Sequence, residues 1–147
     1  MSGYDYISAV TGCTTDVHGR FTLSGPGFQL LADGSIATGG PGRAPGPLDL
    51  LVSALVTNML NVLRGGGDLD LDEVDTRAVQ VRARATRYLP DRLKAGHLLV
   101  EVVIDELDAL DTEVLLEQYR AGCRVLPAIE TVLDVTIRPV AAADVAA

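Results

Sequence analysis

Two cysteines are the residues of this chain with the clearest capacity for chemistry. Cys13 lies near the start of the 147-residue chain and Cys123 lies near its end. Two cysteines do not make a disulfide framework, so we expect reduced thiols and a cytoplasmic location. A thiol reacts as its thiolate. Cys123 is also explained as a small buried hydrophobe on a helix face, so its type alone does not assign a role.

Asn58 is the third residue of interest, because it is an amide in an apolar helix. Residues 47–64 predict this helix: Pro47 suits its first turn, Arg64 suits its negative end, and three glycines follow. At 100° per residue, Asn58 lies about 60° beyond the polar stripe. A buried amide without partners costs about 1–3 kcal/mol. Asn58 is therefore either a structural amide or a polar group in a site. The stripe comprises Asp49, Ser53, Thr57, Asn61 and Arg64.

The rest of the chain predicts the elements that must position these residues. A helix as apolar as 47–64 is buried on most sides, within a fold or against a partner subunit, and it is too polar and too well capped to span a membrane. A second helix begins at a cap on Asp111 and is broken or restarted at Pro127. Its apolar face carries Leu115, Leu116, Tyr119 and Cys123 at a spacing of three to four residues, which predicts Tyr119 as a core residue. The order β-β-β-α-β-β-α-β indicates an α+β fold with antiparallel hairpins. The predicted strands are 4–12, 17–23, 27–33, 74–88, 98–104 and 131–138, with turns at Asp16–Gly19 and Asp33-Gly34. In the long strand 74–88, Val79, Val81, Ala83 and Ala85 alternate with polar residues, which predicts one buried face.

Size and charge narrow the classes of protein. We expect one domain over residues 1–140 and a disordered tail over 141–147. A net charge of −8 argues against nucleic acid and anionic membranes as partners, and 48% apolar residues favour a homodimer. Residues 1–12 lack the pattern of a signal peptide. The acidic run 68–75 predicts a solvated loop, and two histidines predict no metal site. We expect no cofactor.

The element order and two local patterns resemble the family of osmotically inducible protein C and the organic hydroperoxide resistance proteins. Residues 46–55, GPLDLLVSAL, are similar to the family's Gly-x-x-Pro-x-Glu-Leu-Leu-x-Ala-x-Leu helix start. Residues 121–127, AGCRVLP, are similar to its Cys-Pro-x-x motif. The resemblance covers roughly residues 17–138. It implies an intertwined homodimer, in which antiparallel sheets wrap two long central helices and the sites lie at the subunit interface.

The resemblance also implies a reaction, the reduction of organic hydroperoxides in the oxidative-stress response. In active members one cysteine attacks the peroxide as a thiolate and becomes a sulfenic acid, and a second cysteine condenses with it to a disulfide. Counted from Pro47, the attacking position falls on Asn58, and a slip by one residue gives Thr57 or Met59. None of these is a thiol, so the two-cysteine cycle cannot run as described. The resolving position falls on Cys123.

The family's remaining site residues, a glutamate and an arginine, map less directly. The glutamate position carries Asp49, and Arg124 follows Cys123 where the family has proline. Matching Thr11-Gly12 to the family places the arginine near Cys13 or Thr14. Arg20 fits with a shift of several residues, and Arg43 lies in the loop before the helix.

Three hypotheses follow. In the first, the interface cavity binds a small apolar, acidic or hydroperoxide-like ligand, with Asn58 as a hydrogen-bond anchor and Thr57, Arg20, Arg43 and Cys13 as further candidates. In the second, the chain is a divergent thiol enzyme that uses Cys123, with Cys13 as its partner. In the third, the site is vestigial and the dimer is a structural or interaction protein.

Overall fold

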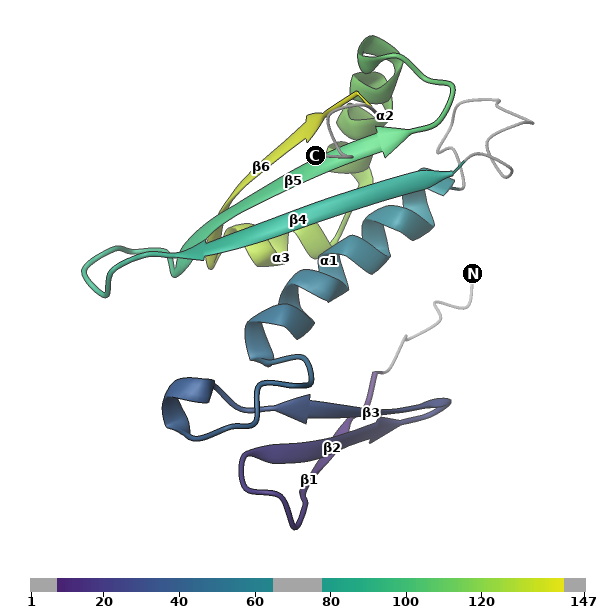
Figure 1. Ribbon diagram of the computed structural model, residues 1–147. Helices are drawn as coiled ribbons and strands as arrows, with labels where there is room; N and C mark the ends of the chain where they lie inside the picture. The colour runs from purple at the N-terminus through teal and green to yellow at the C-terminus, as the bar shows by residue number, and fades with distance from the viewer. Residues whose placement is uncertain (1–7, 65–77, 142–147) are drawn as a thin grey trace, which may run out of the picture. The chain divides into compact units, whose positions relative to one another are not determined.

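Two three-stranded sheets form the β part of the molecule (Figure 1). The computed structural model describes residues 8–64 and 78–141. The predicted acidic loop at 68–75, residues 142–147 of the predicted tail and residues 4–7 of the first predicted strand lie outside the described residues. The chain divides into two compact units, Met1–Leu51 and Val52–Ala147. Each unit is described by itself.

The N-terminal unit holds an antiparallel sheet of β1 (Thr11–Thr14), β2 (Arg20–Gly25) and β3 (Phe28–Asp33). The predicted turn at Asp16–Gly19 joins β1 to β2, where the Thr15 amide donates to the Arg20 carbonyl. Pro26 and Gly27 join β2 to β3, and Gly27 has a φ of 84°. Proline followed by a glycine at positive φ is the pattern of a type II turn. The 3₁₀ helix η1 (Ile36–Thr38) and a loop lead on to helix α1.

Few side chains of this unit are buried. Ala32 and Asp33 are buried among its described residues, whereas Phe28 is 43% exposed and Leu31 is 47% exposed. A small sheet needs a covered apolar face to be stable. The described part of the N-terminal unit therefore has no hydrophobic core of its own.

The C-terminal unit contains a sheet in the order β4-β5-β6, with helices behind it in the view of Figure 1. Helix α1 (Pro47–Arg64) begins in the N-terminal unit and continues here, with the predicted bounds. Its residues Leu55, Met59 and Leu63 recur every fourth position and are buried in the core. The other elements are β4 (Val79–Arg87), β5 (Gly96–Ile104), α2 (Ala109–Gly122), α3 (Val125–Glu130) and β6 (Leu133–Pro139).

The alternation predicted for the long fourth strand is confirmed. Val79, Val81, Ala83 and Ala85 pack against the core, and Gln80, Arg82, Arg84 and Thr86 are exposed. On α2 the predicted apolar face is also confirmed. Its buried members are Leu115, Leu116 and Tyr119. The α+β class and the order of strands and main helices are therefore as predicted.

Three details of the prediction are wrong. β4 and β5 are antiparallel, but β5 and β6 are parallel, because helices α2 and α3 carry the chain back to the starting end of β5. Helix α2 is capped by Asp108, whose Oδ1 accepts a hydrogen bond from the Asp111 amide, so Asp111 lies inside the first turn. The break or restart predicted at Pro127 comes earlier: α2 ends at Gly122, and a separate short helix, α3, begins at Val125 with Pro127 in its first turn, where a missing N–H costs little.

Candidate functional site

Helix α1 places Asn58 at the flank of its buried stripe. The neighbouring Met59 is fully buried, and Asn58 is half-buried one position before it. The start of the helix is fixed by Asp49, whose Oδ2 accepts a hydrogen bond of 2.9 Å from the Gly46 amide. The Leu50 amide donates in return to the Gly46 carbonyl. The bond to Asp49 is one half of a capping box, because Gly46 has no side chain to supply the other half, and the bond from Leu50 is the first intrahelical one.

The end of helix α2 supplies the other two members of the site. Tyr119 and Cys123 are four residues apart, so their side chains lie on one face of the helix. Cys123 is the C-cap, and its amide donates to the Tyr119 carbonyl at 2.9 Å. Tyr119 is 1% exposed and Cys123 is half-buried. The turn into α3 then brings the Leu126 amide toward the Cys123 sulfur.

Asn58, Tyr119 and Cys123 form one hydrogen-bonded cluster. The Tyr119 hydroxyl donates to Asn58 Oδ1 at 2.8 Å, and the Cys123 sulfur lies 2.9 Å from the same oxygen, as its S–H donor. The sulfur is also 3.1 Å from the Tyr119 hydroxyl. The Leu126 amide donates to the sulfur at 3.3 Å. The amide oxygen is thus the common acceptor for a phenol and a thiol.

The two sides of the Asn58 amide have different surroundings. Its oxygen faces Tyr119, and burial, together with the adjacent Cys123 sulfur, raises the pKa of the Tyr119 hydroxyl well above its usual value. Tyr119 therefore remains a neutral donor over the physiological range. No described residue accepts a hydrogen bond from Asn58 Nδ2, which keeps two N–H donors for another partner.

Arg20, a predicted site residue, is instead committed to a buried ion pair. Its Nε lies 2.8 Å from Asp33 Oδ1, and its second nitrogen lies 3.0 Å from Oδ2. The backbone amides of Arg43 and Ala44 donate to the same Oδ2 at 2.8 and 2.9 Å. Asp33 is 1% exposed. The Arg20 guanidinium and these two amides hold the pKa of the Asp33 carboxyl well below its usual range.

This carboxylate anchors the loop that enters α1. Besides its side-chain bonds, the Asp33 amide donates to the Pro45 carbonyl at 3.0 Å. Three consecutive loop residues, 43–45, are therefore bound to one position on β3. From the sequence, Asp33 was predicted only as a turn residue at the end of the strand 27–33. Arg20 and Asp33 are cross-strand partners in the β2–β3 register, and that register is the signal that could have found the pair.

The remaining predicted site residues form none of the hydrogen bonds of the Asn58, Tyr119 and Cys123 cluster. Thr57 is exposed on α1, and Asp49 caps that helix. Cys13 is an exposed free cysteine on β1, within the N-terminal unit. In the described part of the chain, no group of three or more His, Cys, Asp or Glu side chains could hold a metal ion. No described helix is both long enough and apolar enough to cross a membrane.

Tyr119 is the member of the cluster that sequence reasoning missed. Its helical spacing predicted a core residue, and its ring is indeed buried. The hydroxyl was the available signal, because a buried tyrosine hydroxyl needs a hydrogen-bond partner. Here that partner is the Asn58 amide, 61 positions away along the chain.

The three-stranded sheets, the long helix between them in sequence and the short helices before the last strand constitute the OsmC-like α+β fold. Solved structures carry this assignment. An organic hydroperoxide resistance protein OsmC from Legionella pneumophila matches with a TM-score of 0.70 and 17% identity, covering 95% of this chain and 100% of its own. OhrB of Bacillus subtilis matches with a TM-score of 0.63 and 12% identity, covering 92% and 98%.

An OsmC-like protein from Mycoplasma pneumoniae gives a TM-score of 0.64 at 15% identity, covering 93% of this chain and 99% of its own. At such identities the likeness establishes the fold. No protein-family model matches the sequence, and no curated protein matches it either.

Proposed function

We propose that this chain is a divergent member of the OsmC and Ohr family that binds a small molecule and does not run the two-cysteine peroxidase cycle. The observation that carries the proposal is the contact of 2.9 Å between Asn58 Oδ1 and Cys123 Sγ. The residue facing the resolving position is thus the one to which the resemblance assigns the attacking cysteine. An amide forms neither a thiolate nor a sulfenic acid, so the first step of that cycle has no nucleophile.

The surroundings of Asn58 favour binding over an inert packing role. Two donors already satisfy its oxygen, whereas Nδ2 has no acceptor among the described residues. An N–H pair beside apolar helix residues suits a ligand with an apolar body and one acceptor oxygen, such as a carboxylate, a carbonyl or a hydroperoxide. Thr57 and Arg43 are further candidates for ligand contact that the sequence predicts. Arg20 is a weaker one, because Asp33 already binds its guanidinium.

The proposed assembly is a homodimer in the cytoplasm, with the site at the subunit interface. Two observations support a partner subunit. The described N-terminal unit lacks a hydrophobic core, and α1 leaves Leu51 37% exposed. Sedimentation equilibrium of the full chain tests this part: we expect a dimer at micromolar concentration, and a monomer at all concentrations contradicts it.

The binding proposal is tested with octanoate as the probe, monitored through the side-chain amide resonances of Asn58. Saturable shifts of this NH₂ pair are expected. Asn58→Asp is the matched variant, because it keeps an oxygen for Tyr119 and Cys123 but removes both N–H donors. We expect this variant to lose the octanoate response, and equal affinity in both proteins would contradict the role of Asn58.

The peroxidase part has its own test. With cumene hydroperoxide and dithiothreitol, the protein is expected to consume no more peroxide than a Cys123→Ser variant does. Mass spectrometry of Cys123 after peroxide treatment separates the alternatives. A sulfenic acid or a disulfide that forms within seconds would favour the divergent thiol enzyme. An unmodified thiol together with no octanoate binding would favour the vestigial site.

A further inference from the structure

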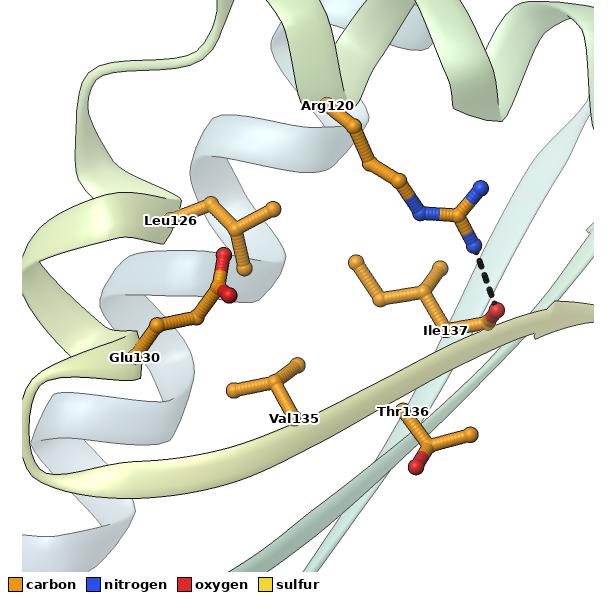
Figure 2. Close-up of a pocket in the computed structure, with 6 residues that line it drawn as sticks. All are labelled: Arg120, Leu126, Glu130, Val135, Thr136 and Ile137. Carbon is orange, nitrogen blue, oxygen red and sulfur yellow. Dashed lines mark hydrogen bonds between the residues drawn. The ribbon is translucent and has the colours of Figure 1, made fainter.

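A hollow lies within the C-terminal unit, between helices α2 and α3 and strand β6 (Figure 2). It has a volume of about 490 Å³, within the usual range of small-molecule sites. Its lining does not include Asn58, Tyr119 or Cys123, although the amide of one lining residue, Leu126, donates to the Cys123 sulfur. The lining comprises Arg120, Leu126, Glu130, Val135, Thr136 and Ile137.

The inner surface of the hollow is apolar. Figure 2 shows the Val135 and Ile137 side chains directed from β6 toward the helices, whereas Thr136 turns to the opposite side of the strand. Leu126 of α3 lies across from them, and it is 4% exposed. These three aliphatic side chains offer a surface for the apolar body of a ligand.

Two charged residues, Arg120 and Glu130, line the hollow, and they differ in their partners. Arg120 Nη1 lies 2.8 Å from a Glu113 carboxylate oxygen and 3.2 Å from one of Glu117. This guanidinium is therefore already neutralised. Glu130, by contrast, forms no ion pair with any described residue, and Figure 2 shows its carboxylate beside Leu126. Because Arg120 is already paired, Glu130 is the lining charge that has no partner among the described residues, which favours a cationic ligand over an anion.

Arg120 also determines the shape of ligand that fits. β6 is the last strand of its sheet, and such an edge can take an added peptide strand. Here Arg120 Nη2 donates to the Ile137 carbonyl at 2.7 Å, so that edge acceptor is occupied. Pro139, at the end of β6, has no N–H to offer. The capped edge argues against strand addition and for a compact ligand.

We propose that this hollow binds a small organic cation, with its apolar body on Leu126, Val135 and Ile137 and its protonated amine at Glu130. This site is independent of the proposed function at Asn58. It assigns a binding role to Glu130 and a shaping role to Arg120.

The test uses three phenylalkyl probes of similar size and different charge on the full-length protein: 2-phenylethylamine, 2-phenylethanol and 3-phenylpropionate. Methyl resonances of Leu126, Val135 and Ile137 report binding. We expect saturable shifts with the amine, an affinity about fivefold lower for the alcohol, as an exposed ion pair of about 1 kcal/mol gives, and the weakest response with the carboxylate.

The matched variants are Glu130→Gln and Asp91→Asn, the latter an exposed acid outside the hollow. Glu130→Gln is expected to reduce the affinity for the amine to that for the alcohol, and Asp91→Asn to leave it unchanged. Equal affinities for all three probes in the unaltered protein would overturn the proposal without any variant. So would an absence of methyl shifts at the three aliphatic residues.

Discussion

Replacing Asn58 by cysteine should restore a redox pair at the cluster. The cysteine sulfur takes the place of Asn58 Cγ, one bond short of an oxygen that lies 2.9 Å from Cys123 Sγ. The new thiol would attack an organic hydroperoxide, breaking the O–O bond and releasing the alcohol as it becomes a sulfenic acid. Condensation with the Cys123 thiol then releases water and leaves a disulfide, which dithiothreitol reduces to two thiols.

The stability change follows from the positions of the two residues. They are 65 positions apart, and closing a loop of that size stabilises the folded state by about 4 kcal/mol at 25 °C. Loss of the amide oxygen leaves the buried Tyr119 hydroxyl without its acceptor, at a cost of about 1–3 kcal/mol. The free energy of unfolding of the oxidised variant should therefore be about 1–3 kcal/mol higher than that of the unaltered protein. This difference corresponds to a melting temperature about 5 °C higher.

Thermal unfolding with and without dithiothreitol measures this difference, and thiol titration after diamide treatment measures the bond. The oxidised variant should titrate as a single thiol, that of Cys13. The matched control combines Asn58→Cys with Cys123→Ser and should not gain the stability, because no disulfide can form. Its peroxide consumption is not the readout, because dithiothreitol can reduce the sulfenic acid at position 58 directly. Three titratable thiols after oxidation of the single variant would refute the assignment of position 58 as the counterpart of Cys123.

Three further predictions concern single contacts. Tyr119→Phe removes the phenol donor, and the urea midpoint should fall by the equivalent of about 1 kcal/mol at an unchanged m-value, whereas an unchanged midpoint would contradict the contact. Asp33→Asn should lower the melting temperature at pH 7. Binding to Arg20 depresses the folded-state pKa of Asp33. The unaltered protein should therefore be more stable than the variant above about pH 4, and this difference in stability should shrink progressively below that pH. A difference that does not depend on pH would count against the ion pair. Gln118 Oε1 is buried with no partner among the described residues, so Gln118→Met should stabilise the fold by about 1 kcal/mol. The same change at exposed Gln80 should leave the stability unchanged. A loss of stability in Gln118→Met would show that this side chain has a partner.

Local signals predicted the parts of the fold that local physics decides. The bounds of α1 follow from Pro47, Arg64 and an apolar arc, all within 18 residues. The alternation of β4 follows from the pleat of a single strand. The direction of β6 depends on how α2 and α3 return the chain, and no residue of β6 itself encodes it.

The N-cap of α2 and the partner of Asn58 are two features that the sequence alone could not predict. Asp108 and Asp111 both have the side chain of an N-cap, and the choice between them depends on where the backbone turns. Asn58 was identified from its own helix, as an amide beside an apolar arc. Its partner Tyr119 comes from an element 61 positions away, and a tertiary contact of that range has no local pattern.

The parallel pairing of β5 with β6 has a consequence for the order of folding. β4 and β5 join residues 9 to 25 positions apart, from Arg87 and Gly96 to Val79 and Ile104. β5 and β6 join residues 37 positions apart throughout, as at Glu101 and Arg138. Contacts between nearer residues close faster, so the β4–β5 hairpin should precede β6 on the folding pathway. Cys123 lies on the connection between β5 and β6 and is covered only when that connection docks. The rate at which the Cys123 thiol becomes resistant to alkylation during refolding should therefore report the rate of the last and slowest step of sheet assembly, the docking of β6.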